Sequence, residues 1–480
     1  MTLVQSLARF ACNLRWSDIP QEQQDAIRLH LLDTLGCILF ARHLPLGKIA
    51  IDLLTSDDQA HSILGTRRRA SASDAALLNG ILAAAFELDA AGAYVHPGPC
   101  IIPAAFVAAE RTSQALGRSV PGDEFLAAIF AGYEITVRVS DWVGFTPERL
   151  AGWHTPAFHG AIGAAASAAL LLGASADGVS NAIALATDMA GGGLIHARND
   201  SKRVHTGRAA QTGVLAALLA AAGTEGTQDI LEDSRWGYRR ALCIGDDIDS
   251  GKVGDDSGPL PGTAFRFEAL QRLAFKYYPF HSAAQTIIDN VVDLRRATGI
   301  SSADVKSVKV GLSTYMYEHA SMLKPALSLA SVNFSLPYAV ALSLVKDVPR
   351  VTAPQVDMRM FLESYLEEDI RELQRRVSFY PAQQLDRENE YTMDTFVDVL
   401  TFDGRELRQR SGYGIRAKAE KGASAIAFDD VTRVNVEEKF RNLSSMGAGT
   451  HDSANRVIGL IEELPRADVG SFVRALTTEF

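Results

Sequence analysis

The stretch that decides the fold is residues 152–173, GWHTPAFHGAIGAAASAALLLG. Its apolar residues recur at spacings of three and four, which predicts a helix starting near Phe158. Alanine, glycine and serine dominate the apolar face, and side chains this small let neighbouring helix axes approach closely. Residues 201–222, SKRVHTGRAAQTGVLAALLAAA, contain a second helix of this kind, which we place from Ala209 onward. The sequence therefore predicts tightly packed helices with histidines and cations at their ends.

Composition narrows the class of protein. The chain has 480 residues, of which 47% are hydrophobic and 22% charged, and its formal net charge is −10. This length leaves room for two or three domains. The acidic balance gives no general attraction for phosphate backbones or anionic lipids, so we expect neither nucleic acid nor a membrane as a partner.

Cysteine usage and the N-terminal segment indicate the compartment. The four cysteines are scattered and form no Cys-x-x-Cys pair, which favours a reducing cytoplasm. Residues 1–16 carry charges within their apolar pattern, which is typical of an amphipathic helix rather than a signal peptide. The most apolar stretch is shorter than the roughly 20 residues of a membrane span. We expect a soluble, cytoplasmic protein.

The periodicity of the sequence changes twice along the chain. Up to about residue 222 it is helical, with start signals such as Ser71-Ala-Ser-Asp and Pro121-Gly-Asp-Glu. Residues 305–313 and 395–402 alternate apolar and polar residues, which predicts strands, and residues 334–345 and 358–373 are helical between them. Helical periodicity returns from about residue 429. We predict a helical domain over 1–262, an α+β segment over 263–415 and a helical return over 416–480.

Two histidines precede predicted helices. Asp89 lies seven residues before His96, whose backbone is restricted by the following proline. A carboxylate partner could orient the His96 ring for acid–base work. His154 lies at a helix N-terminus, where the positive end of the dipole favours the neutral imidazole, a competent base. The alternatives are a polar surface loop for His96 and a capping or packing role for His154.

A cationic cluster follows the second histidine. A bound anion would compensate cations that oppose the dipole of the next helix, although a solvated basic loop fits the same residues. The cluster consists of Arg198, Lys202, Arg203, His205 and Arg208.

Residues 275–281, Phe-Lys-Tyr-Tyr-Pro-Phe-His, place Lys276 and aromatic rings where a cleft wall or an interdomain packing hinge would fit. No serine or cysteine lies in a nucleophile motif. The spacing of His154 and His159 does not match a helical metal pair, so we expect no metal. The remaining histidines, carboxylate and lysine suit removal of a proton from carbon next to a carboxylate, with no organic cofactor.

Several of these stretches together resemble the MmgE/PrpD family, whose members include 2-methylcitrate dehydratase, cis-aconitate decarboxylase and iminodisuccinate epimerase. The resemblance implies a mainly α fold: a large helical domain built from both chain ends, a smaller α+β lid domain, an active-site cleft between them, and a homodimer. The stretches that carry it are LLDTLGCILFA, LDAAGAYVHPG, GWHTPAFHG, SKRVHTGRAAQTG, KYYPFHSAAQTIID, NFSLPYAVAL and VEEKF.

The resemblance also implies roles for individual residues. His96, His154 and Lys202 match positions that the family uses in its active site, and Asp89 matches the first acidic residue of its Asp-rich loop. Among predicted substrate-binding residues, Tyr317 matches a lid-side tyrosine, and we add Lys276, His281 and Arg203.

The chain departs from the family pattern at two places. Ala90-Ala91-Gly92 replaces the usual Asp-Asp-Thr or Asp-Asp-Gly, and His281-Ser282 with Gln285 replaces a Cys-Arg and a later histidine. Losing that arginine removes a bidentate carboxylate fork.

We therefore predict a cofactor-independent lyase, a dehydratase or decarboxylase, that acts on a small di- or tricarboxylate by proton transfer at the carbon alpha to a carboxylate. In this prediction His96 and His154 share the acid and base roles, Lys202 binds carboxylate, and Asp89 orients a histidine. The alternatives are an epimerase or isomerase of a small dicarboxylate, similar to iminodisuccinate epimerase, and a non-catalytic binding homologue.

Overall fold

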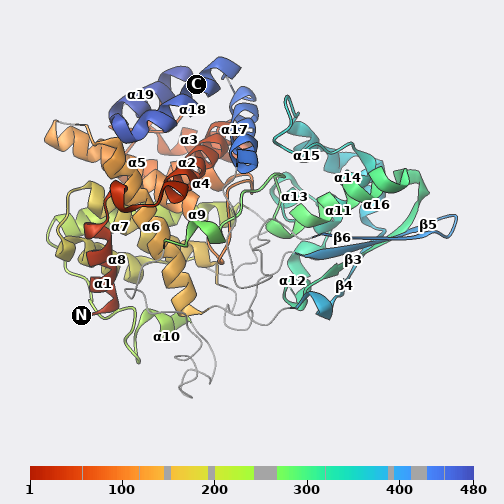
Figure 1. The fold of residues 1–480 in the computed structure, drawn as a ribbon, viewed down its shortest axis with the longest axis horizontal. Coiled ribbons are helices and arrows are strands. Elements are labelled where there is room, and N and C mark those ends of the chain that lie inside the picture. Colours follow the sequence, from red (N-terminus) through yellow and green to blue (C-terminus); the bar gives the residue numbers. More distant parts are fainter. Residues whose placement is uncertain are drawn as a thin grey trace. The chain divides into compact units, whose positions relative to one another are not determined.

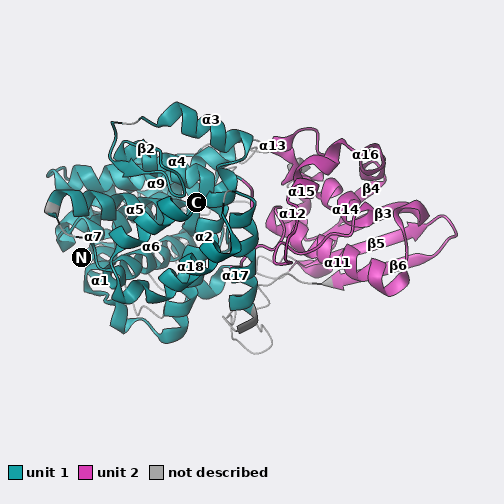
Figure 2. Ribbon diagram, turned by 90° about the horizontal axis from the view of Figure 1, so that it is seen from above, with its two compact units in different colours: residues 1–85, 89–273, 427–480 teal, residues 86–88, 274–426 magenta. Residues whose placement is uncertain are grey.

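The computed structural model describes residues 1–56, 58–117, 119–144, 153–192, 200–242, 267–318, 320–386, 394–411, 430–447 and 449–480. The chain divides into two compact units (Figure 2). Unit 1 contains residues 1–85, 89–273 and 427–480, and unit 2 contains residues 86–88 and 274–426. The predicted domain ends at residues 262 and 415 both lie outside the described residues.

Unit 1 is built from helices of the N-terminal half of the chain and of its C-terminal segment, as Figure 1 shows. Its one described strand pair, which we did not predict, joins β1 (His61–Ser62) to β2 (Arg69–Ala70) in antiparallel register. Its helices are α1 (Leu3–Asn13), α2 (Gln21–Ala41), α3 (Pro45–Leu54), α4 (Ala72–Ala84), α5 (Pro97–Leu116), α6 (Gly122–Val143), α7 (Thr155–Leu171), α8 (Ala176–Met189), α9 (Ser201–Ala221), α10 (Tyr238–Leu242), α17 (Asp430–Ser445), α18 (His451–Glu463) and α19 (Val469–Glu479).

Two predicted helix starts were correct and two were wrong. The Ser71 side chain caps α4 by accepting the Asp74 N–H, and α6 begins directly after Pro121. Helix α7 begins at Thr155 rather than near Phe158, because Pro156 fits the first turn of a helix. Helix α9 begins at Ser201 rather than Ala209. The basic residues from Lys202 to Arg208 therefore lie inside its first two turns.

Small residues set the distances between the central helices. A Cβ atom on Gly163 of α7 would lie 2.0 Å from Thr136 Oγ1 and 2.4 Å from the Gly132 carbonyl oxygen, both in α6. A Cβ on Gly80 of α4 would lie 2.7 Å from the Gly207 Cα in α9. No larger residue fits at these crossings unless the helices move apart.

Helix α17, the first described helix of the C-terminal segment, packs along α2 (Figure 1), which joins the two ends of the chain in one unit. A Cβ on Gly36 of α2 would lie 3.2 Å from the Phe440 ring, so this pair is also closely packed. Asp33 lies in α2 one turn before Gly36, and its Oδ1 lies 2.5 Å from Lys439 Nζ of α17. Both side chains are buried.

Unit 2 contains a four-stranded sheet in the order β4-β3-β5-β6, with α11 packed against β5 and β6. Strand β3 is parallel to β4 and antiparallel to β5, which forms an antiparallel hairpin with β6. The strands are β3 (Val305–Leu312), β4 (Val377–Pro381), β5 (Thr395–Thr401) and β6 (Glu406–Ser411). The helices are α11 (Ser282–Thr298), α12 (Thr314–Glu318), α13 (Leu329–Val332), α14 (Leu336–Val345), α15 (Arg359–Glu363) and α16 (Glu368–Gln374).

The predicted strands at 305–313 and 395–402 are confirmed as β3 and β5, and the predicted helix at 334–345 as α14. The single helix predicted over 358–373 is wrong, because α15 and α16 are separated by a 3₁₀ turn. Phe361 and Ile370 are both buried, yet nine residues of continuous helix would turn them to opposite sides. The break lets both reach the core.

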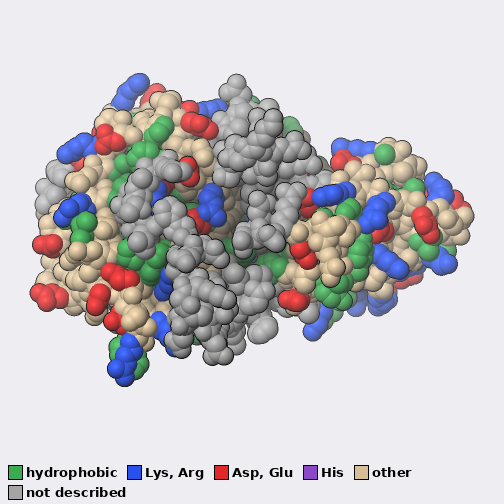
Figure 3. Space-filling model, turned by 60° about the horizontal axis from the view of Figure 1, so that its bottom comes forward, with side chains coloured by type: hydrophobic (Ala, Val, Ile, Leu, Met, Phe, Trp, Pro, Cys, Tyr) green, Lys and Arg blue, Asp and Glu red, His purple; other side chains and the backbone are tan. Residues whose placement is uncertain are grey.

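On the face drawn in Figure 3, acidic and basic side chains are interspersed over the described surface of each unit. Within the described residues, no helix combines the length and the apolarity that crossing a bilayer requires.

Gly163→Ala is expected to lower the free energy of unfolding by about 1–3 kcal/mol, because its methyl group would overlap α6. Gly459→Ala in α18 is the control, since no atom lies within 4 Å of the added Cβ. It is expected to raise stability by about 0.5–1 kcal/mol through helix propensity. Urea unfolding followed by circular dichroism measures both, and equal effects of the two substitutions would contradict this packing.

Candidate active site

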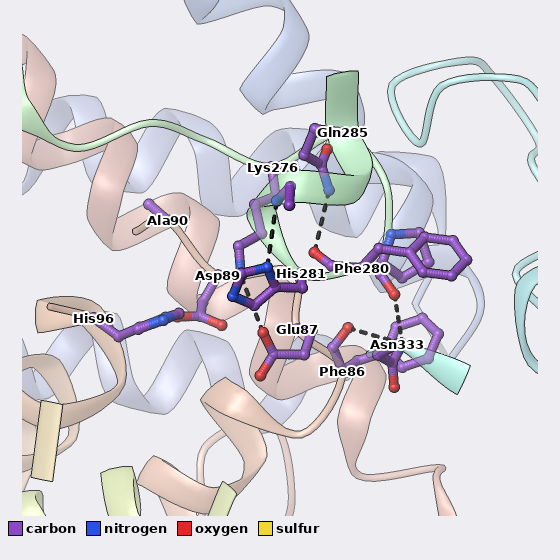
Figure 4. A network of polar contacts seen from close by, with 12 residues as sticks. Phe86, Glu87, Asp89, Ala90, His96, Lys276, Phe280, His281, Gln285 and Asn333 are labelled. Carbon is purple, nitrogen blue, oxygen red and sulfur yellow. Dashed lines mark hydrogen bonds and ion pairs between the residues drawn. The ribbon is translucent and has the colours of Figure 1, made fainter. Parts of the chain in front are cut away.

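A carboxylate–histidine pair lies in the loop that joins α4 to α5 (Figure 4). Asp89 Oδ2 lies 2.6 Å from His96 Nδ1, and the Asp89 side chain is buried. A carboxylate can only accept here, so His96 carries the proton on Nδ1 and its Nε2 is the nitrogen that can exchange a proton with a ligand. The predicted pairing of Asp89 with a histidine is observed.

The loop that carries this pair is held in an unusual backbone conformation. Ala93 and Tyr94 have positive φ values of 47° and 59°, which are unfavourable for residues with a Cβ. Ser140 donates to the Ala93 carbonyl at 2.9 Å, and Thr155 donates to the Tyr94 carbonyl. A Cβ at Gly92 would lie 2.0 Å from the Arg272 carbonyl oxygen. Contacts from three other segments of unit 1 therefore fix this loop.

The second candidate histidine, His154, is the N-cap residue of α7 and is buried. Its Nδ1 lies 3.3 Å from Nδ1 of His205 in α9. One of the two nitrogens must donate and the other accept, so the pair shares one proton at this contact. Burial lowers the pKa of His205, and the N-terminus of α7 disfavours a positive His154.

Cys100 connects the helix ends that carry the two candidate histidines. Its Sγ lies 3.4 Å from the His96 carbonyl and 3.6 Å from the Pro156 carbonyl. Burial raises the pKa of this thiol, which stays protonated and able to donate. Unit 1 thus brings the N-termini of α5 and α7 together, with His96 at one and His154 at the other.

The residues of the predicted cationic cluster differ in their burial and in their contacts. Arg203 is buried and pairs with Asp200, whereas Arg208 is exposed and donates to Gln211. Lys202 and His205 are three residues apart in α9, so they lie on one face of the helix. His205 on this face contacts His154, and a role for Lys202 beside this pair stays a prediction. Arg198 lies outside the described residues.

Lys276, His281 and Tyr317 belong to unit 2. Lys276 is buried and its Nζ lies 3.3 Å from Glu87 Oε2 (Figure 4), an ion pair that we did not predict. His281 is the N-cap residue of α11, and its Nδ1 accepts the Ala283 N–H. Tyr317 is half-buried in α12. These residues and Arg203 stay predictions as substrate-binding residues.

Gln285, at one of the departures from the family pattern, organises the loop that follows Lys276. Its side-chain oxygen accepts the N–H groups of Tyr277 and Tyr278, each at 3.0 Å. Its amide nitrogen donates to the carbonyls of Tyr278 and Phe280. Gln285 therefore has a structural role, since its side-chain oxygen and nitrogen both form hydrogen bonds with the backbone of unit 2.

His159 lies in the interior of unit 1. It is fully buried, and its Nδ1 lies 3.0 Å from the Tyr238 hydroxyl. Burial lowers the pKa of His159 to about 3. Among the described residues, no group of three or more His, Cys, Asp or Glu side chains has an arrangement that could hold a metal ion.

The fold defines a class of mainly helical two-unit proteins, and unit 1 of this chain holds an aspartate–histidine pair and a histidine–histidine pair. The chain belongs to the MmgE/PrpD family. The model of the MmgE/PrpD N-terminal domain matches residues 5–250, and that of the C-terminal domain matches residues 278–461.

Curated relatives include proteins named as decarboxylases. The cis-aconitate decarboxylase-like protein oryM of Aspergillus oryzae is 33% identical over 239 residues, which cover 48% of this chain and 49% of the relative. Cis-aconitate decarboxylase of Aspergillus terreus is 24% identical over 352 residues, 71% of each chain. The Homo sapiens enzyme is 29% identical over 228 residues, 46% of this chain and 44% of the relative. The chain spans about half the length of the first of these relatives.

His159→Asn is expected to weaken the pH dependence of stability. The folded pKa of about 3 lies below the ordinary value of 6.5, so the unfolded state binds the proton first and stability is lost as pH falls below 6.5. Between pH 7 and pH 5 this loss is about 2 kcal/mol. Urea unfolding at both pH values should show a pH-dependent loss smaller by that amount in the variant. An unchanged difference would contradict a neutral, buried His159.

Proposed function

We propose that this protein is a cofactor-independent lyase that removes carbon dioxide from cis-aconitate or a closely related unsaturated tricarboxylate. The observation that carries the proposal is the Asp89–His96 pair, joined through Cys100 to the N-terminus that bears His154. The names of the relatives favour decarboxylation among the reactions that such a site can catalyse.

The proposed reaction needs one proton and a place for negative charge. The bond between the CH₂ carbon and its carboxylate breaks, and its electron pair forms a new double bond to the central carbon. The former π pair takes a proton at the vinylic carbon, carbon dioxide leaves, and a methylidene dicarboxylate forms. Before that proton arrives, charge develops on the carboxylate attached to the vinylic carbon, so the site must stabilise an enediolate-like state.

The surroundings of the two histidines favour different protonation states. The Asp89 carboxylate favours a protonated His96, which suits it to donate the proton. His154 lies at the positive end of the α7 dipole, which favours its neutral form, and its Nδ1 contacts Nδ1 of His205. In this proposal His96 is the general acid, and His154 accepts hydrogen bonds or takes a proton in the reverse direction.

Lys202 is the proposed anchor of the developing charge. It lies in the first turn of α9, where its ammonium and the N-terminal N–H groups of the helix can act on the same carboxylate. Arg203 is less available for this role, because its guanidinium is buried and paired with Asp200.

Lys202→Ala is expected to lower kcat for cis-aconitate by about 10²–10³-fold, because the charge of the transition state loses its cation. Arg208→Ala is the matched control, since Arg208 is exposed on the same helix and donates to Gln211. Proton NMR of the reaction mixture measures both rates. Activity of Lys202→Ala equal to that of the control would contradict the assignment.

The same NMR assay in heavy water separates the proposed lyase from the alternatives. Decarboxylation places one deuterium on the carbon that was vinylic and releases carbon dioxide. Exchange of a carbon-bound proton with the carbon skeleton intact would instead indicate an epimerase or isomerase. Thermal stabilisation by tricarboxylates without turnover of any acid tested would indicate a binding protein.

A further inference from the structure

A buried ion pair in unit 1 is not explained by the stability of the fold. Lys439 of α17 and Asp33 of α2 are 0% and 2% exposed, and Nζ lies 2.5 Å from Oδ1. Taking two charges out of water costs free energy that their attraction often fails to recover, and apolar residues of similar volume stabilise such sites equally well. The pair therefore calls for a role beyond packing.

The second oxygen of Asp33 contacts the loop of the candidate site. Asp33 Oδ2 accepts the backbone N–H of Ala90 at 3.1 Å. Ala90 directly follows Asp89, and the peptide unit between them is planar. Fixing the Ala90 N–H therefore fixes the plane from which Asp89 projects toward His96 Nδ1, 2.6 Å away.

Charge explains why the partner of Asp33 is a lysine. The carboxylates of Asp33 and Asp89 repel each other, and both side chains are buried. Burial raises the pKa of Asp33 and the Asp89 carboxylate adds to this rise, whereas the Lys439 ammonium opposes it by supplying a counter-charge and a hydrogen bond. Lys439 comes from a helix near the other end of the chain, held against α2 by the contact of Phe440 with Gly36.

We propose that Lys439 and Asp33 are positioning residues that set the geometry of the Asp89–His96 pair through the Ala90 N–H, so that α17 helps to position the candidate site. This inference rests on the proposed function, because it assigns the pair to the proton transfer of that reaction.

Two double variants separate positioning from packing. D33L/K439M removes both charges together, which avoids an unpaired buried charge, and leaves the Ala90 N–H without its acceptor. D33N/K439Q also removes both charges, but the side-chain amide oxygen that it introduces on α2 can still accept that N–H. R433M is the control for loosening α17, because Arg433 pairs with Glu462 at 2.6 Å and does not contact Asp33.

The expected result is a fall in kcat for cis-aconitate of about 10²-fold in D33L/K439M, with KM changed much less, because a misplaced acid slows the chemical step. D33N/K439Q should recover most of kcat, and R433M should match the wild type. Hydrogen exchange read by mass spectrometry should show faster exchange at the Ala90 amide in D33L/K439M alone. Equal kcat values for the two double variants would overturn the proposal.

Two further readouts keep the test decisive. If the wild type does not turn over cis-aconitate, the proposed function fails, and unchanged exchange at Ala90 in D33L/K439M would separately overturn the positioning role. If D33L/K439M does not fold, D33E replaces it, since the longer side chain keeps the charge but moves the acceptor. D33E is then expected to lower kcat with little change in KM, and a wild-type kcat would overturn the proposal.

Discussion

Close approach of helix axes is the constraint on which the rest of unit 1 depends. Helices α6 and α7 meet at Gly132 and Gly163, and α4 and α9 meet at Gly80 and Gly207, with no room for a Cβ at either crossing. Because these helices cannot separate, their polar ends are held together as well. The candidate site is the place where the loop after α4 and the N-termini of α5, α7 and α9 come together, and its side chains are positioned by the packing of the helices behind them.

Local patterns in the sequence predict most of the fold. Serine at position 71 and proline at position 121 precede helices, and alternation reveals β3 and β5. Strand β4 has only five residues, Val-Ser-Phe-Tyr-Pro, and none of them is buried, so its alternation is too short to predict a strand. The break between α15 and α16 depends on two buried side chains facing one core, and helical periodicity alone does not reveal this.

The side-chain contacts of the candidate site are harder to predict from the sequence than the helices and strands are. The pairing of Asp89 with His96 could be predicted because they lie close together in one loop, with a restrictive proline after the histidine. Other contacts join segments that are far apart in the sequence, so no local pattern predicts them. They are the contact of His154 with His205, the contact of Cys100 with the Pro156 carbonyl and the ion pair of Glu87 with Lys276. Asp33 and Lys439 lie in stretches that resemble the family. A charged residue in a predicted helix is expected to be exposed, and only the structure shows that both of these side chains are buried.

We propose that His96 and His154 face one bound tricarboxylate. Nitrogen-15 NMR of histidine-labelled protein tests it directly when propane-1,2,3-tricarboxylate, an unreactive saturated analogue, is titrated in. His96→Asn and His154→Asn variants assign the two rings. The account predicts that both rings shift with the same saturation curve, and that Lys202→Ala weakens this curve. Binding that leaves both rings unperturbed would contradict it.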